Sequence, residues 1–119
     1  EQLKLHTDAR VLQRALDNLL RNALRFNPTG QPIEFSVAVQ PESRVQFKLR
    51  DHGPGAPAEL LTQLAEPFVR ASGQAANGYG LGLTITQRCV EQLGGSLQLA
   101  NHPEGGFVAS IILPIDNGL

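Results

Sequence analysis

Between Val11 and Leu24, apolar residues recur in pairs every four positions. This spacing predicts an amphipathic helix of about five turns with a single apolar stripe. Asp8 precedes the stripe and offers an N-cap, and the Asn-Pro-Thr-Gly sequence at residues 27–30 ends it. A helix of this kind buries its stripe against another element, so the order of the elements that follow decides the fold.

Alternating apolar residues predict strands at several places. Residues 33–39 and 45–49 alternate on either side of a Pro-Glu-Ser turn. They are expected to form a hairpin whose first strand has one buried face. A second hairpin is expected from apolar residues at 97–99 and 108–113, and a short strand from residues 1–5.

Helices are expected at two further places, a short one at residues 58–64 and a long one at residues 81–93 that ends at two glycines. Residues 70–80 lack apolar periodicity and are predicted to form a mobile loop. The resulting order, strand–helix–hairpin–helix–helix–hairpin, lacks the strict alternation of a doubly wound sheet. It predicts an α/β fold of the two-layer α/β sandwich type, with a mixed sheet packed on about three helices.

Composition and charge narrow the function classes. The 119 residues suit one domain and contain no repeat or linker, so residues 1–119 are expected to form a single domain. A net charge of −1 and the lack of a Lys/Arg run give no reason to expect nucleic acid or an anionic membrane surface as a partner. No apolar stretch approaches the roughly 20 residues that span a bilayer. The chain begins abruptly without methionine, so it is expected to be a piece of a longer protein.

Asn18 and Asn22 lie four residues apart on the first predicted helix and therefore share one face, about 40° apart around the axis. They stand at the border of the apolar stripe, where an amide can point along the rim of a cleft. An amide oxygen is a hard ligand that suits Mg²⁺. Solvated or capping asparagines fit the same positions, so the pair alone leaves both interpretations open.

A carboxylate and two glycines close the second strand of the first hairpin, in the sequence Asp51-His52-Gly53-Pro54-Gly55. Glycines at alternate positions let a flat ligand approach the backbone closely. Asp51 could accept a hydrogen bond from an exocyclic amine such as that of adenine. An ordinary Asp-Gly turn is the alternative.

Three glycines recur at residues 78–83 (Gly-Tyr-Gly-Leu-Gly-Leu), where the expected loop leads into a helix whose free N–H groups suit phosphate. No apolar strand precedes them and no Gly-Lys-Ser/Thr follows, so neither a Rossmann nor a Walker A site is expected. Just before the loop, Phe68 could anchor its base and Arg70 could reach a terminal phosphate. A core phenylalanine and a surface arginine are the alternative.

In combination these stretches resemble the histidine-kinase branch of the GHKL (Bergerat-fold) ATP-binding superfamily, over essentially residues 8–114. The elements follow the family order: the N box at residues 16–26, the first glycine box at 51–55, the F box at 66–70, the second glycine box at 78–83, and a Gly-Gly signature at 105–107 before the last strand.

The resemblance implies a binding site for Mg²⁺ and ATP. Asn22 would ligate Mg²⁺, and Asn18 would support the metal and the phosphates. Arg25 and Arg70 would meet phosphate, so these four residues form the expected catalytic set. Asp51 would bind the adenine amine, and residues 71–77 would form the ATP lid. The other residues expected to contact the nucleotide are Phe26, Gly53, Gly55, Phe68, Gly78, Tyr79, Gly80, Leu81, Gly82 and Leu83.

One helix position separates the classes of this superfamily. Hydrolytic relatives carry a Glu four residues before the metal ligand, as the general base for water. Here that residue is Asn18, which cannot take a proton, and Asp17 lies about 100° further round the helix. The resemblance therefore implies a protein histidine kinase of two-component signal transduction, which transfers the γ-phosphoryl group to a histidine on a separate dimerisation domain. His6, His52 and His102 are interpreted as bystanders.

The implied partners are ATP or ADP, the protein's own dimerisation and phosphoacceptor domain and, indirectly, a response regulator. The isolated domain is expected to be monomeric and to belong to the cytoplasmic part of an inner-membrane sensor protein. Two rival classes stay open: a degenerate domain that binds nucleotide without transfer, and an anti-sigma-type serine kinase of the same fold.

Overall fold

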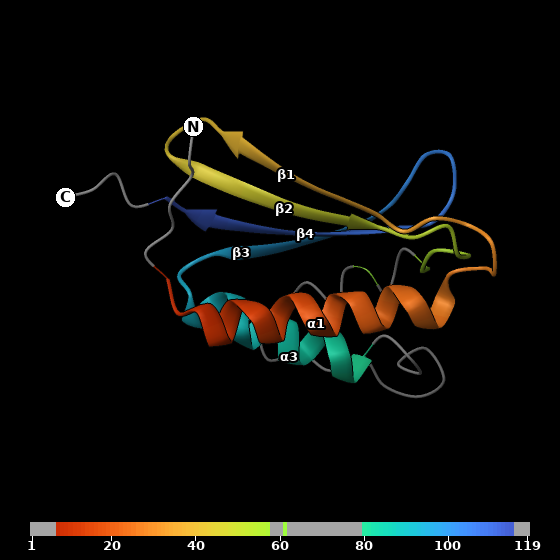
Figure 1. Ribbon diagram of the computed structural model, residues 1–119, viewed down its shortest axis with the longest axis horizontal. Helices are drawn as coiled ribbons and strands as arrows, with labels where there is room; N and C mark the ends of the chain where they lie inside the picture. The colour runs from red at the N-terminus through yellow and green to blue at the C-terminus, as the bar shows by residue number, and fades with distance from the viewer. Residues whose placement is uncertain (1–6, 58–60, 62–79, 116–119) are drawn as a thin grey trace.

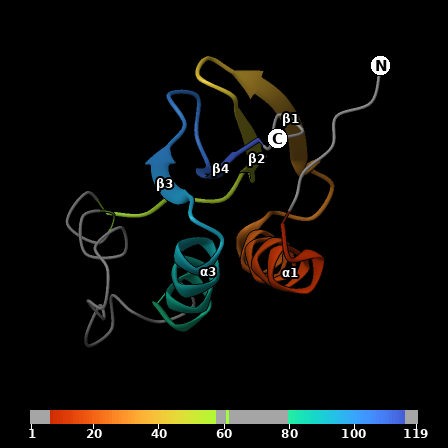
Figure 2. The same cartoon turned by 90° about the vertical axis from the view of Figure 1, so that its left-hand side faces the viewer.

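The computed structural model describes residues 7–57, 61 and 80–115, and of residues 80–82 it describes the backbone. Strands form one layer, and two helices lie side by side on one face of it (Figures 1 and 2). The elements in chain order are α1 (Ala9–Phe26), β1 (Glu34–Gln40), β2 (Arg44–Arg50), α3 (Gly80–Gln92), β3 (Ser96–Asn101) and β4 (Phe107–Pro114).

The four described strands form one sheet in the order β1-β2-β4-β3. The predicted two-layer sandwich and both hairpins are confirmed. The expected mixed character has no counterpart among the described strands, since all three of their pairings are antiparallel. The strand expected at residues 1–5, and most of the helix at 58–64 and of the loop at 70–80, lie outside the described residues.

The first helix begins and ends where the sequence predicts. The side chain of Asp8 accepts hydrogen bonds from the backbone N–H groups of Arg10 at 3.0 Å and Val11 at 3.4 Å, which satisfies donors that have no partner inside the helix. The helix ends at Phe26, before Asn27 and Pro28. Neither described helix has the length and hydropathy that crossing a bilayer requires.

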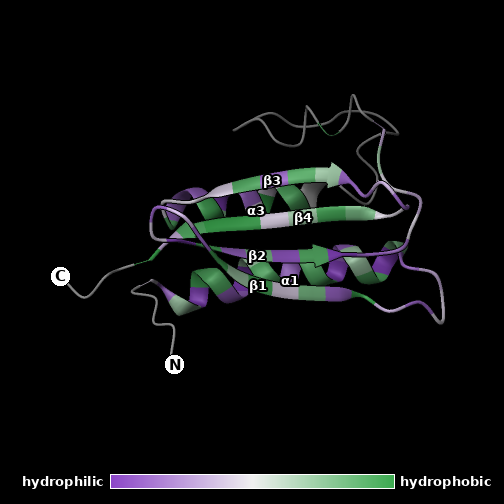
Figure 3. Cartoon of the chain, turned by 90° about the horizontal axis from the view of Figure 1, so that it is seen from above, coloured by the Kyte–Doolittle hydropathy of each residue, from purple (hydrophilic) through white to green (hydrophobic). Residues whose placement is uncertain are grey.

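The core lies between the helices and the middle of the sheet. β4 runs between β2 and β3, and it is buried from Phe107 to Leu113. Seen from above, β4 is predominantly hydrophobic, whereas β2 carries more hydrophilic residues (Figure 3). The most completely buried apolar side chains are Ala15, Val45, Leu83, Val90, Ile111 and Leu113.

The expectation that β1 has one buried face is wrong. Phe35, Val37 and Val39 remain 53%, 48% and 65% exposed. The register pairs them with Leu49, Phe47 and Val45, so they stand on the helix-facing side of the sheet. Within the described residues β1 is the edge strand, and α1 does not cover it. A surface depression with a volume of about 310 Å³ lies between α1 and β1. Most of the residues that line it are apolar: Leu16, Asp17, Leu19, Leu20, Ile33, Phe35 and Leu49.

Candidate functional site

Asp51 directly follows β2, and only 2% of it is exposed. Its Oδ1 accepts the backbone N–H of Gly53 at 2.8 Å and that of Phe107 at 3.1 Å. Its own backbone N–H donates to the carbonyl of Phe107 at 3.0 Å. These three bonds hold the carboxylate where β2 ends and β4 begins. The second oxygen, Oδ2, takes no part in them and is the candidate acceptor for a ligand amine.

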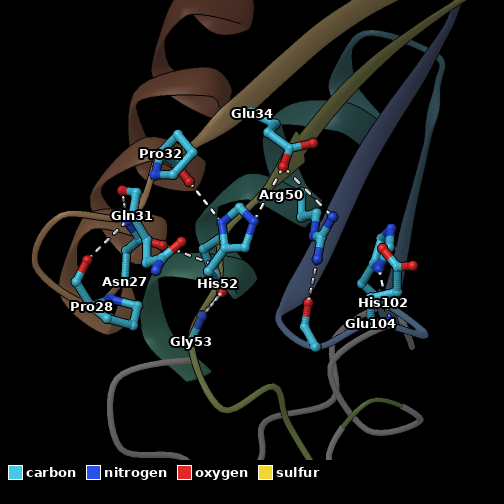
Figure 4. Close-up of polar contacts among 12 residues, drawn as sticks. Asn27, Pro28, Gln31, Pro32, Glu34, Arg50, His52, Gly53, His102 and Glu104 are labelled. Carbon is cyan, nitrogen blue, oxygen red and sulfur yellow. Dashed lines mark hydrogen bonds and ion pairs between the residues drawn. The ribbon is translucent and has the colours of Figure 1, made fainter.

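The turn after Asp51 packs against the end of α1. A Cβ on Gly53 would lie 2.6 Å from the carbonyl oxygen of Phe26, so a residue with a side chain could not approach the helix this closely. Asn27 Oδ1 accepts the backbone N–H of His52 at 2.7 Å, and Asn27 Nδ2 donates to the carbonyl of Gln31 at 2.7 Å (Figure 4). The N-box helix and the first glycine turn are thereby joined.

The ring of His52 is held by residues at the start of β1 (Figure 4). Its Nδ1 lies 2.7 Å from the carbonyl oxygen of Pro32, and its Nε2 lies 3.2 Å from Oε2 of Glu34. Both contacts are to oxygen atoms, and together they fix the orientation of the ring. Arg50 lies 3.6 Å from the same Glu34 carboxylate and donates to the carbonyl of Gly105 at 2.9 Å.

The Gly-Gly signature has a structural reason at this site. Gly106 has a φ of +99°, and a Cβ there would overlap the carbonyl oxygen of Asp51. The turn between β3 and β4 therefore packs directly on the backbone of the glycine box. The neighbouring Gly105 has a φ of +103° but no atom within 4 Å of its hypothetical Cβ.

Asn22 is the residue in α1 that best fits a metal ligand. It is 6% exposed, and its Oδ1 is buried with no hydrogen-bond partner in the described part of the chain. Buried carbonyl oxygens normally have a partner, and a hard oxygen aimed at a cation is one physical use for such an atom. The residues present therefore fit a Mg²⁺ ion. Asn18 donates its Nδ2 to the carbonyl of Arg14 at 2.9 Å, so its Oδ1 is the end that a ligand could use.

Of the other residues expected to contact phosphate, the structure describes some and leaves others out. Arg25 is exposed, and its guanidinium lies 6.0 Å from the ring centroid of Phe26. Gly80 is the first residue of α3, which runs opposite to α1 and begins beside the carboxyl-terminal half of that helix (Figures 1 and 2). Leu83 is fully buried in the core, so a contact with a ligand would have to use its backbone. Phe68, Arg70, Gly78, Tyr79 and the expected lid at residues 71–77 lie outside the described residues.

The sequence did not predict the roles of two asparagines at the site. Asn27 was expected only to help end the first helix. Asn101, at the end of β3, accepts the backbone N–H of Ala56 at 2.8 Å and donates to the carbonyl of Ala56 at 2.6 Å. No sequence pattern singles it out, because its partner is 45 positions away.

Comparison with known proteins agrees with this geometry. The family model described as "Histidine kinase-, DNA gyrase B-, and HSP90-like ATPase" matches residues 7–117. Sensor protein QseC of Escherichia coli (strain K12) is 37% identical over 101 residues, which cover 85% of this chain and 21% of that protein. Adaptive-response sensory kinase SasA of Synechococcus sp. (strain CC9311) is 33% identical over 117 residues, which cover 97% of this chain and 30% of that protein. The chain thus spans less than a third of either relative.

Solved structures show the same fold. The mycobacterial sensor histidine kinase MprB superimposes with a TM-score of 0.74 at 28% identity, covering 91% of this chain and 72% of that one. A nucleotide-free catalytic domain of histidine kinase ThkA gives a TM-score of 0.78 at 27% identity, covering 97% of this chain and 73% of that one. The relatives' names confirm the predicted resemblance to histidine kinases.

Proposed function

The chain belongs to the family of histidine kinase-, DNA gyrase B- and HSP90-like ATPases, and we propose that it binds Mg²⁺-ATP beside the end of β2 and transfers the γ-phosphoryl group to a histidine on a separate dimerisation domain. The observation that carries the proposal is the buried Asp51, whose Oδ1 is fixed by two backbone N–H groups. A rigid, desolvated carboxylate of this kind suits the exocyclic amine of adenine.

The turn that follows Asp51 would form the base pocket. Gly53 and Gly55 would line this pocket with their backbone, because the carbonyl of Phe26 and Oδ1 of Asn101 fill the space where side chains would point. Phe26 stands at the end of α1, where its carbonyl already contacts the turn, and its half-buried ring would pack near the adenine. Phe68 would anchor the base of the lid at residues 71–77.

The carboxyl-terminal half of α1 and the start of α3 would hold the phosphates. Asn22 supports this part of the proposal because its buried Oδ1 lacks a partner among the described residues. Mg²⁺, when bound there, would neutralise charge on the phosphates. Asn18, Arg25 and Arg70 would contact phosphate oxygens through their side chains. The glycine-rich segment at the start of α3 would contribute backbone N–H groups, from Gly78, Tyr79, Gly80, Leu81, Gly82 and Leu83.

The amide at position 18 favours transfer to an imidazole over hydrolysis. Asn18 cannot accept a proton from water, and the nearby Asp17 is exposed and lines the depression between α1 and β1. A neutral imidazole needs no base, because one ring nitrogen carries a lone pair. That nitrogen would attack the γ-phosphorus, the bond to the bridging oxygen would break, and ADP would leave. The chain's contribution is to position the nucleotide.

The acceptor histidine would lie on a dimerisation domain of the longer protein, of which residues 1–119 form the catalytic and ATP-binding domain. The phosphoryl group would then pass to a response regulator. By analogy with the sensor proteins that it resembles, the domain would lie on the cytoplasmic side of a bacterial inner membrane. The isolated domain would be monomeric.

Calorimetry with a non-hydrolysable ATP analogue, with Mg²⁺ and then with EDTA, tests nucleotide binding. Saturation at a hundredfold excess over Kd should stabilise the fold by about 2.7 kcal/mol. No heat and no stabilisation at millimolar ligand would overturn the proposal. Transfer of radiolabel to a supplied acceptor domain tests the kinase step, and binding without transfer would indicate the degenerate binding module instead.

A further inference from the structure

Asn101 and Ala56 are joined by two hydrogen bonds although they belong to different parts of the sequence. Asn101 Oδ1 accepts the N–H of Ala56 at 2.8 Å, and Asn101 Nδ2 donates to the carbonyl of Ala56 at 2.6 Å. The carboxamide thus makes both of the bonds that a residue on a neighbouring strand would exchange with Ala56. Ala56 is 5% exposed, so solvent offers its backbone little alternative.

The same carboxamide lies against Gly55, the second glycine of the first glycine box. A Cβ on Gly55 would lie 2.7 Å from Asn101 Oδ1, and Gly55 has a φ of +76°. The turn is therefore held at both ends. Asp51 fixes its beginning to β4 through Phe107, and Asn101 fixes its end to β3.

We propose that Asn101 is a positioning residue for nucleotide binding, which acts through Ala56 and does not touch the nucleotide. This inference rests on the proposed function, because it concerns the turn that would receive the base. Glycines at positions 53 and 55 give the free turn many backbone conformations. The two hydrogen bonds between Asn101 and Ala56 remove part of that freedom before the nucleotide binds, so binding costs less conformational entropy.

The first test is the Kd of Mg²⁺-ADP, measured by calorimetry for the wild type, Asn101→Ala and Asn101→Asp. Loss of both bonds in Asn101→Ala should raise the Kd about tenfold. Asn101→Asp keeps an acceptor for the Ala56 N–H but sets a carboxylate oxygen against the Ala56 carbonyl, so its Kd should rise at least as much. Gln98→Ala is the matched control, since Gln98 is an exposed amide on the same strand and its loss should leave the Kd unchanged.

Amide hydrogen exchange of the nucleotide-free chain separates positioning from general loss of stability. In Asn101→Ala the N–H of Ala56 should exchange faster, whereas Ile111 in the central strand β4 should keep its protection. Equal loss of protection at both residues, or global unfolding of both Asn101 variants, would overturn the inference. So would an unchanged Kd in Asn101→Ala while the wild type binds. Failure of the wild type to bind ADP would instead overturn the proposed function, and the inference with it.

Discussion

The side chain of Asp51 accepts the backbone N–H of Phe107 at 3.1 Å, while the backbone N–H of Asp51 donates to the carbonyl of Phe107 at 3.0 Å. Arg50, which precedes Asp51, and Val108, which follows Phe107, are the last pair in the antiparallel register of β2 and β4. The carboxylate therefore extends the strand pairing by one step. The residue expected to read the base is held by the sheet itself, so changes to its charge can be separated from changes to its position.

We expect Asp51→Asn to weaken adenine nucleotides selectively. Asparagine keeps an Oδ1 that can accept from Gly53 and Phe107, but the charged acceptor is lost, which costs about 1.5–3 kcal/mol, or roughly 10- to 150-fold in Kd. Calorimetry with ADP and GDP measures the effect. Asp17→Asn, on the exposed side of α1, should change neither affinity. Equal weakening of ADP and GDP by Asp51→Asn would show that Asp51 does not read the base.

Replacement of Asn22 by alanine should separate stability from function. The change removes a buried carbonyl oxygen that lacks a partner in the described structure, and alanine is the better helix former. The free energy of unfolding without ligand should stay equal or rise by about 0.5 kcal/mol. The Mg²⁺-dependent part of ADP affinity should disappear, as should transfer to an acceptor. Urea denaturation and calorimetry with and without EDTA are the measurements.

The control for this prediction is Gln13→Ala, at an exposed site on the same helix, which should leave ADP affinity unchanged. A large loss of stability in Asn22→Ala would refute this account.

The two glycines of the turn between β3 and β4 offer a matched pair. Gly105 and Gly106 both have positive φ, so alanine at either position should cost about 1 kcal/mol from backbone strain. Only at Gly106 would the new Cβ overlap the carbonyl of Asp51. Gly106→Ala should therefore destabilise the fold further and also weaken ADP binding, whereas Gly105→Ala should leave binding intact. Similar ADP affinities for the two folded variants would contradict the proposed contact between this turn and the site.

The amide side chain of Asn18 predicts that phosphoryl transfer to a histidine is faster than hydrolysis of ATP by water. With an amide at Asn18, phosphate release by the chain alone should stay far below the ordinary enzyme range, which begins at about 1 s⁻¹. Radiolabel should still pass to a histidine when an acceptor domain is supplied. Asn18→Glu supplies a carboxylate, but hydrolysis also needs a positioned water, so only a slight increase in phosphate release is expected. Phosphate release near 1 s⁻¹ from the wild type without acceptor would place the chain with the hydrolytic relatives.

Much of the fold was readable from local patterns. The bounds of α1 followed from apolar spacing, the Asp8 cap and the Asn-Pro stop, all of which act between near neighbours. Both hairpins followed from alternation and short turns. The exposure of β1 did not follow, because alternation shows which side chains share a face but not whether a helix covers that face.

For the candidate site, residue types and spacings made Asp51, Asn22 and the glycines chemically suitable, and the resemblance to histidine kinases favoured them over the alternative interpretations. Tertiary structure decided how they are held. Phe107 is 56 positions from Asp51, and Asn101 is 45 from Ala56. The register of the sheet and the packing of its turns determine which residues become such partners. A hydrogen bond between distant segments produces no periodic pattern in the sequence of either segment, so the sequence does not predict it.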